Sequence, residues 1–179
     1  QMLHVAWCLD LAERAAPAWF SADQTTWGDR LDADHDNLRA ALGRSAEGDE
    51  TGMGFRLAGR LWPYWFVRGH HAEGLRWLER ALAWNSAPTI ERVRVLTGTA
   101  CLARCQGDVA RSAAWGSEAR QIVDAIGAGT GIDAAHVVIG LGLDAAVSGD
   151  YRQAIELTEE AMVILRNLQG IEPGVALIE

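Results

Sequence analysis

Lysine is absent from this chain of 179 residues, and all 16 basic residues are arginine. Without lysine the chain cannot build the Gly-Lys-Ser/Thr loop that cradles nucleotide phosphates, and it cannot form a Schiff base through a lysine amine. Proline is rare, with four residues, and the apolar–polar alternation typical of β-strands is nearly missing. These absences exclude two kinds of enzyme chemistry and favour a helical protein.

Long apolar runs are also missing. No run approaches the roughly 20 residues that a membrane-spanning helix needs, and no signal peptide is recognisable. The cysteines Cys8, Cys101 and Cys105 are odd in number and have no framework spacing, which indicates a reducing compartment. We therefore expect a cytoplasmic protein that does not contact membranes. Cys101 and Cys105 would share one helical face, which suits a metal or redox pair, but core packing is the commoner role of such thiols.

The charge is negative overall but unevenly distributed. The formal net charge is −8, whereas residues 51–120 carry ten arginines and only five acidic residues. An acidic chain is poorly suited to direct nucleic-acid binding, because that affinity depends on neutralising phosphates. The basic middle segment remains available for anionic ligands.

Apolar residues recur at helical spacing from the start of the chain. A first helix is expected from about residue 2 to residue 16, before Pro17. A second is expected to begin near Ser21 or Asp23, to run to about residue 46 and to break near Asp34. Residues 1–50 would thus form an N-terminal helical cap or linker region.

From residue 51 onward a glycine-centred pattern occurs three times. Gly69, Gly107 and Gly149 are 38 and 42 residues apart, and an alanine follows each of them by twelve positions. Glycine suits the tight turn between antiparallel helices. Asp108 and Asp150 directly follow two of these glycines and are suitable N-caps for the second helix of each pair.

A small residue lies five positions after each turn glycine. These residues are Gly74, Ser112 and Ala154, and they would let the second helix of each pair approach the first closely. Periods of this length indicate stacked helix pairs, because no pair can bury its apolar face alone. Residues 51–179 are therefore expected to form three helix pairs and the start of a fourth.

The last unit resembles a tetratricopeptide repeat. It has Leu141-Gly142 in its first helix, followed by Gly149-Asp-Tyr151 and by Ala154 and Ala161 in its second. The resemblance implies an all-α fold, an α-solenoid of antiparallel helix pairs forming a right-handed superhelix, with about nine helices. Because the spacings exceed the roughly 34 residues of that repeat, we expect a less regular superhelix.

Two longer strings, at residues 27–42 and 56–82, resemble a more particular family. They are similar to the tetratricopeptide-like helical region of bacterial STAND-type signal-transduction ATPases, many of which are large LuxR-family transcriptional regulators. Because the chain begins with Gln1 and residues 175–179 are typical of the start of a helix, we expect it to be a piece of a longer protein.

That family resemblance implies a role in sensing or protein interaction. The chain would control neighbouring domains of its parent and would need neither a cofactor nor catalysis of its own. The alternative is a passive scaffold or self-association domain, and assembly into a homo-oligomer stays open. An enzyme would need an acid–base or metal constellation, and the sequence presents none.

Three local motifs have weaker interpretations. Residues 32–37 superficially suggest a calcium loop, but Asn37 and Gly43 replace the required Gly and Glu. The glycine cluster at residues 127–131 has helical flanks, unlike a dinucleotide-binding turn. No pair of histidines, including His70-His71, has the spacing of a closed zinc site. No metal site is expected.

In tetratricopeptide arrays the first helix of each pair lines a concave groove. Transferring that geometry to this chain places ten side chains on the groove: Arg56, Arg60, Phe66, Arg94, Thr97, Cys101, Arg104, His136, Ile139 and Leu143. Arginines on one wall suit the binding of carboxylate or phosphate, so the expected ligand is an acidic protein segment or a small anion. The alternative is that these arginines only pair with acidic residues of neighbouring helices.

Overall fold

The structure, a computed structural model, describes residues 2–48 and 52–168. Within these residues the chain is entirely helical, without strands, which confirms the expected all-α class and helix number. The elements in chain order are α1 (Met2–Ala15), the short 3-10 helix η1 (Ala16–Ala18), α2 (Gln24–Ala33), α3 (His35–Ser45), α4 (Met53–Val67), α5 (His71–Leu82), α6 (Ile90–Cys105), α7 (Val109–Ala125), α8 (Ile132–Val147) and α9 (Tyr151–Asn167).

The N-terminal helices follow the expected boundaries closely. Helix α1 ends at Ala15 because Pro17 lies in η1, the 3-10 turn that follows it. The expected break at Asp34 separates α2 from α3, and Asp34 is the C-cap of one helix and the N-cap of the other. The second predicted helix is thus two helices joined by one residue.

Three helical hairpins follow, and their turns agree with the repeat. Gly69, Gly107 and Gly149 adopt left-handed φ angles of +76°, +84° and +85°, which glycine tolerates without the steric cost that a side chain adds. The side chains of Asp108 and Asp150 accept hydrogen bonds from the third backbone N–H beyond them, as N-caps do. Both predicted caps are confirmed.

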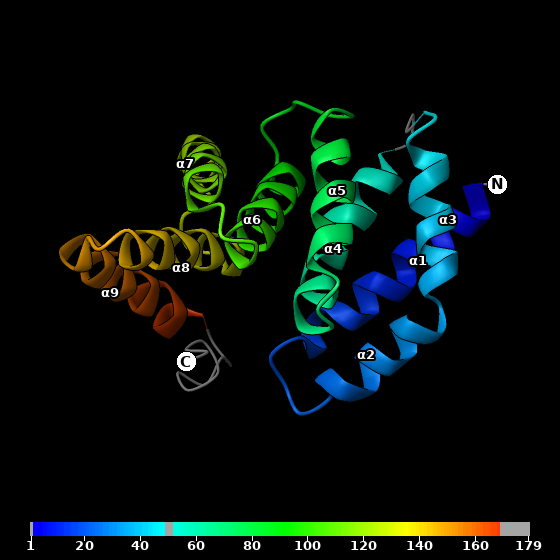
Figure 1. The fold of residues 1–179 in the computed structure, drawn as a ribbon, viewed down its shortest axis with the longest axis horizontal. Helices are drawn as coiled ribbons and strands as arrows, with labels where there is room; N and C mark the ends of the chain where they lie inside the picture. Colours follow the sequence, from blue (N-terminus) through cyan, green and yellow to red (C-terminus); the bar gives the residue numbers. More distant parts are fainter. Residues whose placement is uncertain (1, 49–51, 169–179) are drawn as a thin grey trace.

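Packing between consecutive helices organises the rest of the molecule. Helix α6 contacts α4, α5, α7 and α8, and α8 contacts α6, α7 and α9. Figure 1 shows the N-terminal helices at one end of the long axis and α8 and α9 at the other. The first helices of the three hairpins therefore lie next to one another in the order α4, α6, α8.

Small residues allow the close approach that the repeat predicts. A Cβ atom on Gly74 would lie 2.6 Å from Cδ1 of Leu102 and 2.7 Å from Cβ of Trp65, so only glycine fits between α4, α5 and α6. Ser112 and Ala154 are buried at the equivalent positions.

The apolar interior has two parts. One cluster joins α1 to α5 with one side of α6 and includes the buried Trp19, Trp62 and Trp65. The second joins α6 to α9 through residues such as Val93 and Val138. Most of the large aromatic volume therefore lies at the N-terminal end, between helices of unequal length and direction.

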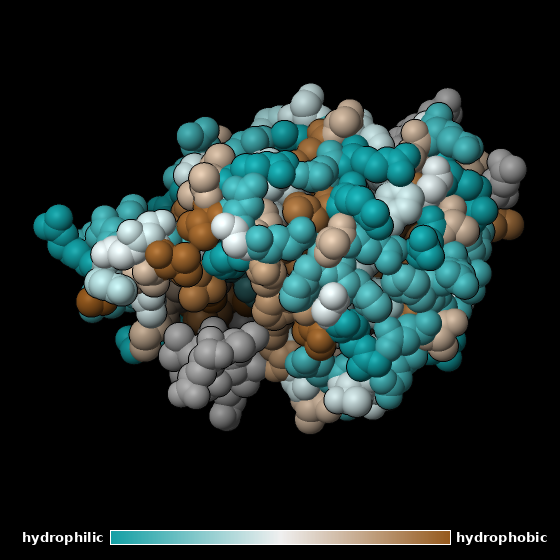
Figure 2. Space-filling model, viewed as in Figure 1, coloured by the Kyte–Doolittle hydropathy of each residue, from teal (hydrophilic) through white to brown (hydrophobic). Residues whose placement is uncertain are grey.

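The surface differs between the two ends. Figure 2 shows hydrophobic residues gathered over the end formed by α7, α8 and α9, whereas the opposite end is mostly hydrophilic on the same face. The exposed large apolar side chains of this end are Ile126, Ile132, Leu143, Val147, Tyr151, Ile155 and Val163. None of the described helices combines the length and apolarity required to cross a lipid bilayer.

Candidate functional site

The ten side chains predicted to line a groove lie on three neighbouring helices. Helix α4 carries Arg56, Arg60 and Phe66; α6 carries Arg94, Thr97, Cys101 and Arg104; and α8 carries His136, Ile139 and Leu143. Since α6 packs against both α4 and α8, these residues belong to one region of the molecule. Their individual surroundings decide which of them can meet a ligand.

Two of the four arginines in this set are bound to aspartates of α8. Arg94 donates from Nε and Nη2 to the two carboxylate oxygens of Asp133, at 3.0 and 2.8 Å. Arg104 donates from Nη1 to Oδ1 of Asp144 at 3.0 Å and to Oγ of Ser112 at 3.1 Å. Their hydrogen bonds join α6 to α7 and α8, which is a structural role.

Arg56 and Arg60 differ from each other. Arg56 is exposed, and its Nη2 lies 2.6 Å from Oε1 of Glu13 on α1. Arg60 is half-buried, and its side chain has no hydrogen bond or ion pair with any described residue. Burial lowers the pKa of Arg60, and the nearby guanidinium of Arg94 lowers it further. The carboxylates of Glu13 and Asp133 act on this pKa in the opposite sense, and Glu91 lies in the same small depression. Arg60 thus lies among charges of both signs, and its own guanidinium is free to bind a carboxylate or phosphate.

Other members of the set are packing residues. The ring of His136 lies 5.7 Å from that of Phe20 and 5.8 Å from that of Trp62, and burial lowers its pKa. The Thr97 hydroxyl donates to the carbonyl of Val93 at 2.8 Å.

The remaining three apolar members differ in exposure. Phe66 is half-buried and stacks on His71, with ring centroids 6.1 Å apart. Ile139 is half-buried against the second core cluster, whereas Leu143 is exposed. The exposed members of the set are therefore Arg56 and Leu143, and Arg60 is the half-buried member whose charged group has no hydrogen-bond partner among the described residues.

The cysteine pair has contrasting members at the end of α6. Cys101 is half-buried, and its contact with Cys105 raises its pKa. The same contact lowers the pKa of the exposed Cys105 to about 6, with His71 and Arg104 adding to the effect. In the described part of the chain, no group of three or more His, Cys, Asp or Glu side chains is arranged to hold a metal ion.

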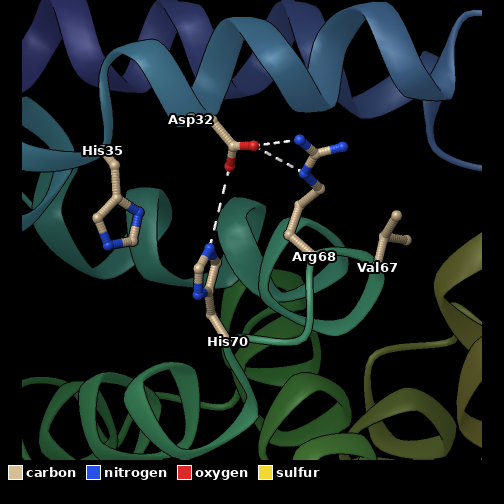
Figure 3. Close-up of a pocket in the computed structure, with 5 residues that line it drawn as sticks. All are labelled: Asp32, His35, Val67, Arg68 and His70. Carbon is tan, nitrogen blue, oxygen red and sulfur yellow. Dashed lines mark hydrogen bonds and ion pairs between the residues drawn. The ribbon is translucent and has the colours of Figure 1, made fainter.

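An open pocket of about 590 Å³ lies elsewhere, where α2 and α3 meet the turn between α4 and α5. Figure 3 shows its lining residues, Asp32, His35, Val67, Arg68 and His70. Asp32 lies on the side formed by α2, and Arg68 and His70 approach it from the hairpin turn. The pocket therefore spans the junction between the N-terminal region and the first hairpin.

Hydrogen bonds connect the pocket to the interior behind it. Arg68 donates from Nε to Oδ2 of Asp32 at 2.8 Å, and the Tyr64 hydroxyl donates to Oδ1 at 2.8 Å. Nδ1 of His35 lies 2.8 Å from the same hydroxyl oxygen, and its Nε2 lies 3.2 Å from Oε2 of Glu73. Because the Tyr64 hydroxyl donates its proton to Asp32, its oxygen is free to accept a hydrogen bond from Nδ1 of His35.

The electrostatics of the pocket follow from these bonds. Burial alone raises the pKa of Asp32, but the hydrogen bonds from Arg68 and Tyr64 outweigh it and hold the pKa below its ordinary value. Burial and the bond to Asp32 raise the pKa of Tyr64 well above the usual range. The Asp32 carboxylate is thus already neutralised by the protein, and the pocket holds no unpaired charge comparable with Arg60.

Sequence reasoning did not bring these pocket residues together. The sequence shows residues 32–37 only as an incomplete calcium loop, and His70-His71 only as a pair without the spacing of a zinc site. Their assembly depends on how α2 and α3 pack against the first hairpin, which no local spacing encodes. The two segments that line the pocket, residues 32–35 and 67–70, are about 35 residues apart, and no spacing within either one indicates a shared pocket.

Comparisons with known proteins identify a similar solved structure but no protein family. No family model matches the chain, and no characterised protein sequence matches it significantly. The structure is similar to that of BtubC (BKLC) from P. vanneervenii, with a TM-score of 0.65 and 16% sequence identity. The similarity covers 95% of this chain and 74% of that chain. At this identity the likeness shows that the two chains share a fold.

Proposed function

We propose that this chain is a non-catalytic interaction module that binds an anionic partner on the surface formed by α4, α6 and α8. The observation that carries the proposal is Arg60, a half-buried guanidinium that makes no hydrogen bond or ion pair with a described side chain, in a small depression that it shares with Arg56, Arg94 and Glu91. A carboxylate or phosphate from outside would supply the missing acceptor, since guanidinium groups bind such oxygens in a bidentate manner.

The architecture of the proposal is an α-solenoid of tetratricopeptide-like hairpins. Packing of α6 on α4 and of α8 on α6, with left-handed glycines at each hairpin turn, supports it. In this proposal the module belongs to a cytoplasmic signal-transduction ATPase or a LuxR-type regulator, as the resemblance of residues 27–42 and 56–82 implies. Binding would favour one arrangement of the hairpins and bias the neighbouring domains.

Arg60 is the residue to test, and Arg104 is not. Arg104 is tied to Asp144 and Ser112, so reversing its charge would disrupt packing as well as any groove. Arg60→Glu changes only an unpaired group. Arg76→Glu is the matched control, because Arg76 is exposed on α5 and receives the same charge change.

The measurement is fluorescence anisotropy with a labelled glutamate dodecapeptide and a glutamine dodecapeptide of equal length. We expect the glutamate peptide to bind at low salt, Arg60→Glu to weaken it by about tenfold and Arg76→Glu to leave it within about twofold. Higher salt should weaken binding because the contact is exposed to solvent. Equal losses in both variants would show only a general charge effect and would refute a site at Arg60.

A second candidate function is a scaffold that self-associates. The exposed apolar side chains of α8 and α9 favour it, because isolated modules seldom expose several large apolar residues together.

A further inference from the structure

Helix α9 exposes the face that the earlier hairpins bury. Six positions after the turn glycine, Leu75 in the first hairpin is 9% exposed, whereas the equivalent Ile155 in the third is 60% exposed. Nine positions after the glycine, Leu78 and Gly116 are buried, whereas Thr158 is exposed. The three hairpins therefore share a packing face, but only the first two use it within the described chain.

Leucines from the following helix cover the first two faces. Leu141 of α8 lies against Gly116 on α7, nine positions after the turn glycine, and Leu102 of α6 belongs to the same core cluster as Leu75 and Leu78 of α5. Among the described helices, only α8 packs extensively against α9. An apolar helix thus fits on α9 in the manner of α6 on α5 and of α8 on α7.

The exposed face of α9 is an uncharged row. Tyr151, Ile155, Thr158 and Met162 follow one another at intervals of four, three and four residues, which places them on one side of the helix. Tyr151 is 70% exposed. Such spacing is that of a helix-pairing seam.

Charges flank this row on one side only. The exposed charged residues on that side are Arg152, Glu156, Glu159 and Arg166. Arg152, Glu159 and Arg166 follow one another at intervals of seven residues, so they occupy the same edge of the row. In an antiparallel helix pair, equivalent edges of the two helices meet. Arg152 of one helix would then lie opposite Glu159 of an identical helix, and the reverse pair would form at the other end.

We propose that two copies of this chain pair through α9, antiparallel and related by a two-fold axis. Tyr151 of each copy packs against Met162 of the other, and Ile155 packs near the axis against Ile155 and Thr158. Each contact between two different residues occurs twice, as in an isologous interface. The exposed face is thus covered by α9 of a second copy. The uncharged rows of the two helices pack on each other, and Arg152 of each copy lies opposite Glu159 of the other.

The first test is the oligomeric state of the 179-residue chain over a concentration series by sedimentation equilibrium. We expect a monomer–dimer equilibrium that Ile155→Asp weakens by at least about tenfold in Kd. Val163→Asp is the matched control, since Val163 is 54% exposed on the same helix but lies off the row. Both side chains are exposed, so both variants should fold, which circular dichroism checks.

The second test is a charge exchange. Arg152→Glu and Glu159→Arg should each weaken dimerisation, because each places like charges opposite one another, and the double variant should restore it. A chain that stays monomeric at all concentrations overturns the proposal and leaves the face to a helix of another protein or segment. A dimer that Val163→Asp disrupts and Ile155→Asp does not would also overturn it.

Discussion

Arg104 and Asp144 form an ion pair inside the interface between the second and third hairpins. Nη1 of Arg104 lies 3.0 Å from Oδ1 of Asp144, and Asp144 is only 4% exposed. The Ser112 hydroxyl donates to the other carboxylate oxygen at 2.8 Å. Both oxygens of Asp144 are therefore satisfied by side chains from α6 and α7, and the three helices are joined through one buried carboxylate.

Removing that carboxylate should destabilise the chain strongly. Asp144→Ala leaves the largely buried Arg104 guanidinium without its counter-charge, a situation that costs about 3 kcal/mol of unfolding free energy. Urea denaturation followed by circular dichroism measures the loss. Asp124→Ala is the control, because Asp124 pairs with Arg120 on the surface, where such a bridge contributes less than about 1 kcal/mol.

A double variant distinguishes the effect of losing the ion pair from the effect of losing side-chain volume. Arg104→Met with Asp144→Leu removes both charges and keeps the volume similar, so it should recover much of the stability lost by Asp144→Ala. If the single variant unfolded at the same urea concentration as the parent chain, the buried pair would have no structural importance.

Gly74 should be intolerant of even one added methyl group. An alanine Cβ there would lie 2.6 Å from Leu102 and 2.7 Å from Trp65, and these side chains are held between α4, α5 and α6. Overpacking of this kind costs about 1–3 kcal/mol. Thermal unfolding of Gly74→Ala, monitored at 222 nm, gives the measurement.

Gly43, another glycine within a helix, should tolerate an added methyl group. A Cβ on Gly43 would lie 3.9 Å from Trp77, an ordinary contact, so Gly43→Ala should stabilise α3 by about 0.5–1 kcal/mol through helix propensity. Stabilisation by alanine at both positions would contradict the close packing at Gly74.

Local chemistry made much of the fold predictable. The glycine spacing located all three hairpin turns, and Asp34 divided two helices, because left-handed turns and caps depend on residues near in sequence. The acidic partners of the arginines could not be predicted from the sequence. Arg94 and Asp133 are 39 residues apart, and nothing in the spacing shows which acidic residue of the next hairpin completes a pair.

The pocket was beyond sequence reasoning for a related reason. Its hydrogen bonds run from α2 and α3 to α4 and α5, so they depend on the angle at which the N-terminal helices meet the first hairpin. Hydrophobic periodicity predicts which face of a helix is buried, but it leaves that angle undetermined.

The Asp32 carboxylate should make the free energy of unfolding depend on pH. Its folded-state pKa lies below the ordinary 3.8, since bonds from Arg68 and Tyr64 outweigh its burial. A carboxylate with a lowered pKa stabilises the fold fully above the unfolded value, and the contribution is lost as pH falls through the folded value. The parent chain should therefore be more stable than Asp32→Asn at pH 6, and the difference should shrink below about pH 4.

Urea denaturation of both chains between pH 2.5 and pH 6 checks this dependence. Asp36→Asn is a suitable control, because Asp36 is almost fully exposed and makes only a 3.8 Å contact with Arg39. A difference between the parent and Asp32→Asn that stayed constant over the whole range would show that Asp32 gains nothing from its charge.

Asp108 should contribute to stability through the start of α7 alone. Its side chain accepts a hydrogen bond from the Arg111 backbone N–H at 3.1 Å, so Asp108→Ala leaves that donor to solvent and should cost about 1 kcal/mol. Asp108→Asn keeps the acceptor and should retain most of that stability, although it weakens the favourable charge near the helix N-terminus. Chemical denaturation ranks the three chains. Equal destabilisation by alanine and asparagine would assign the effect to the 3.7 Å ion pair with Arg111 instead of the cap.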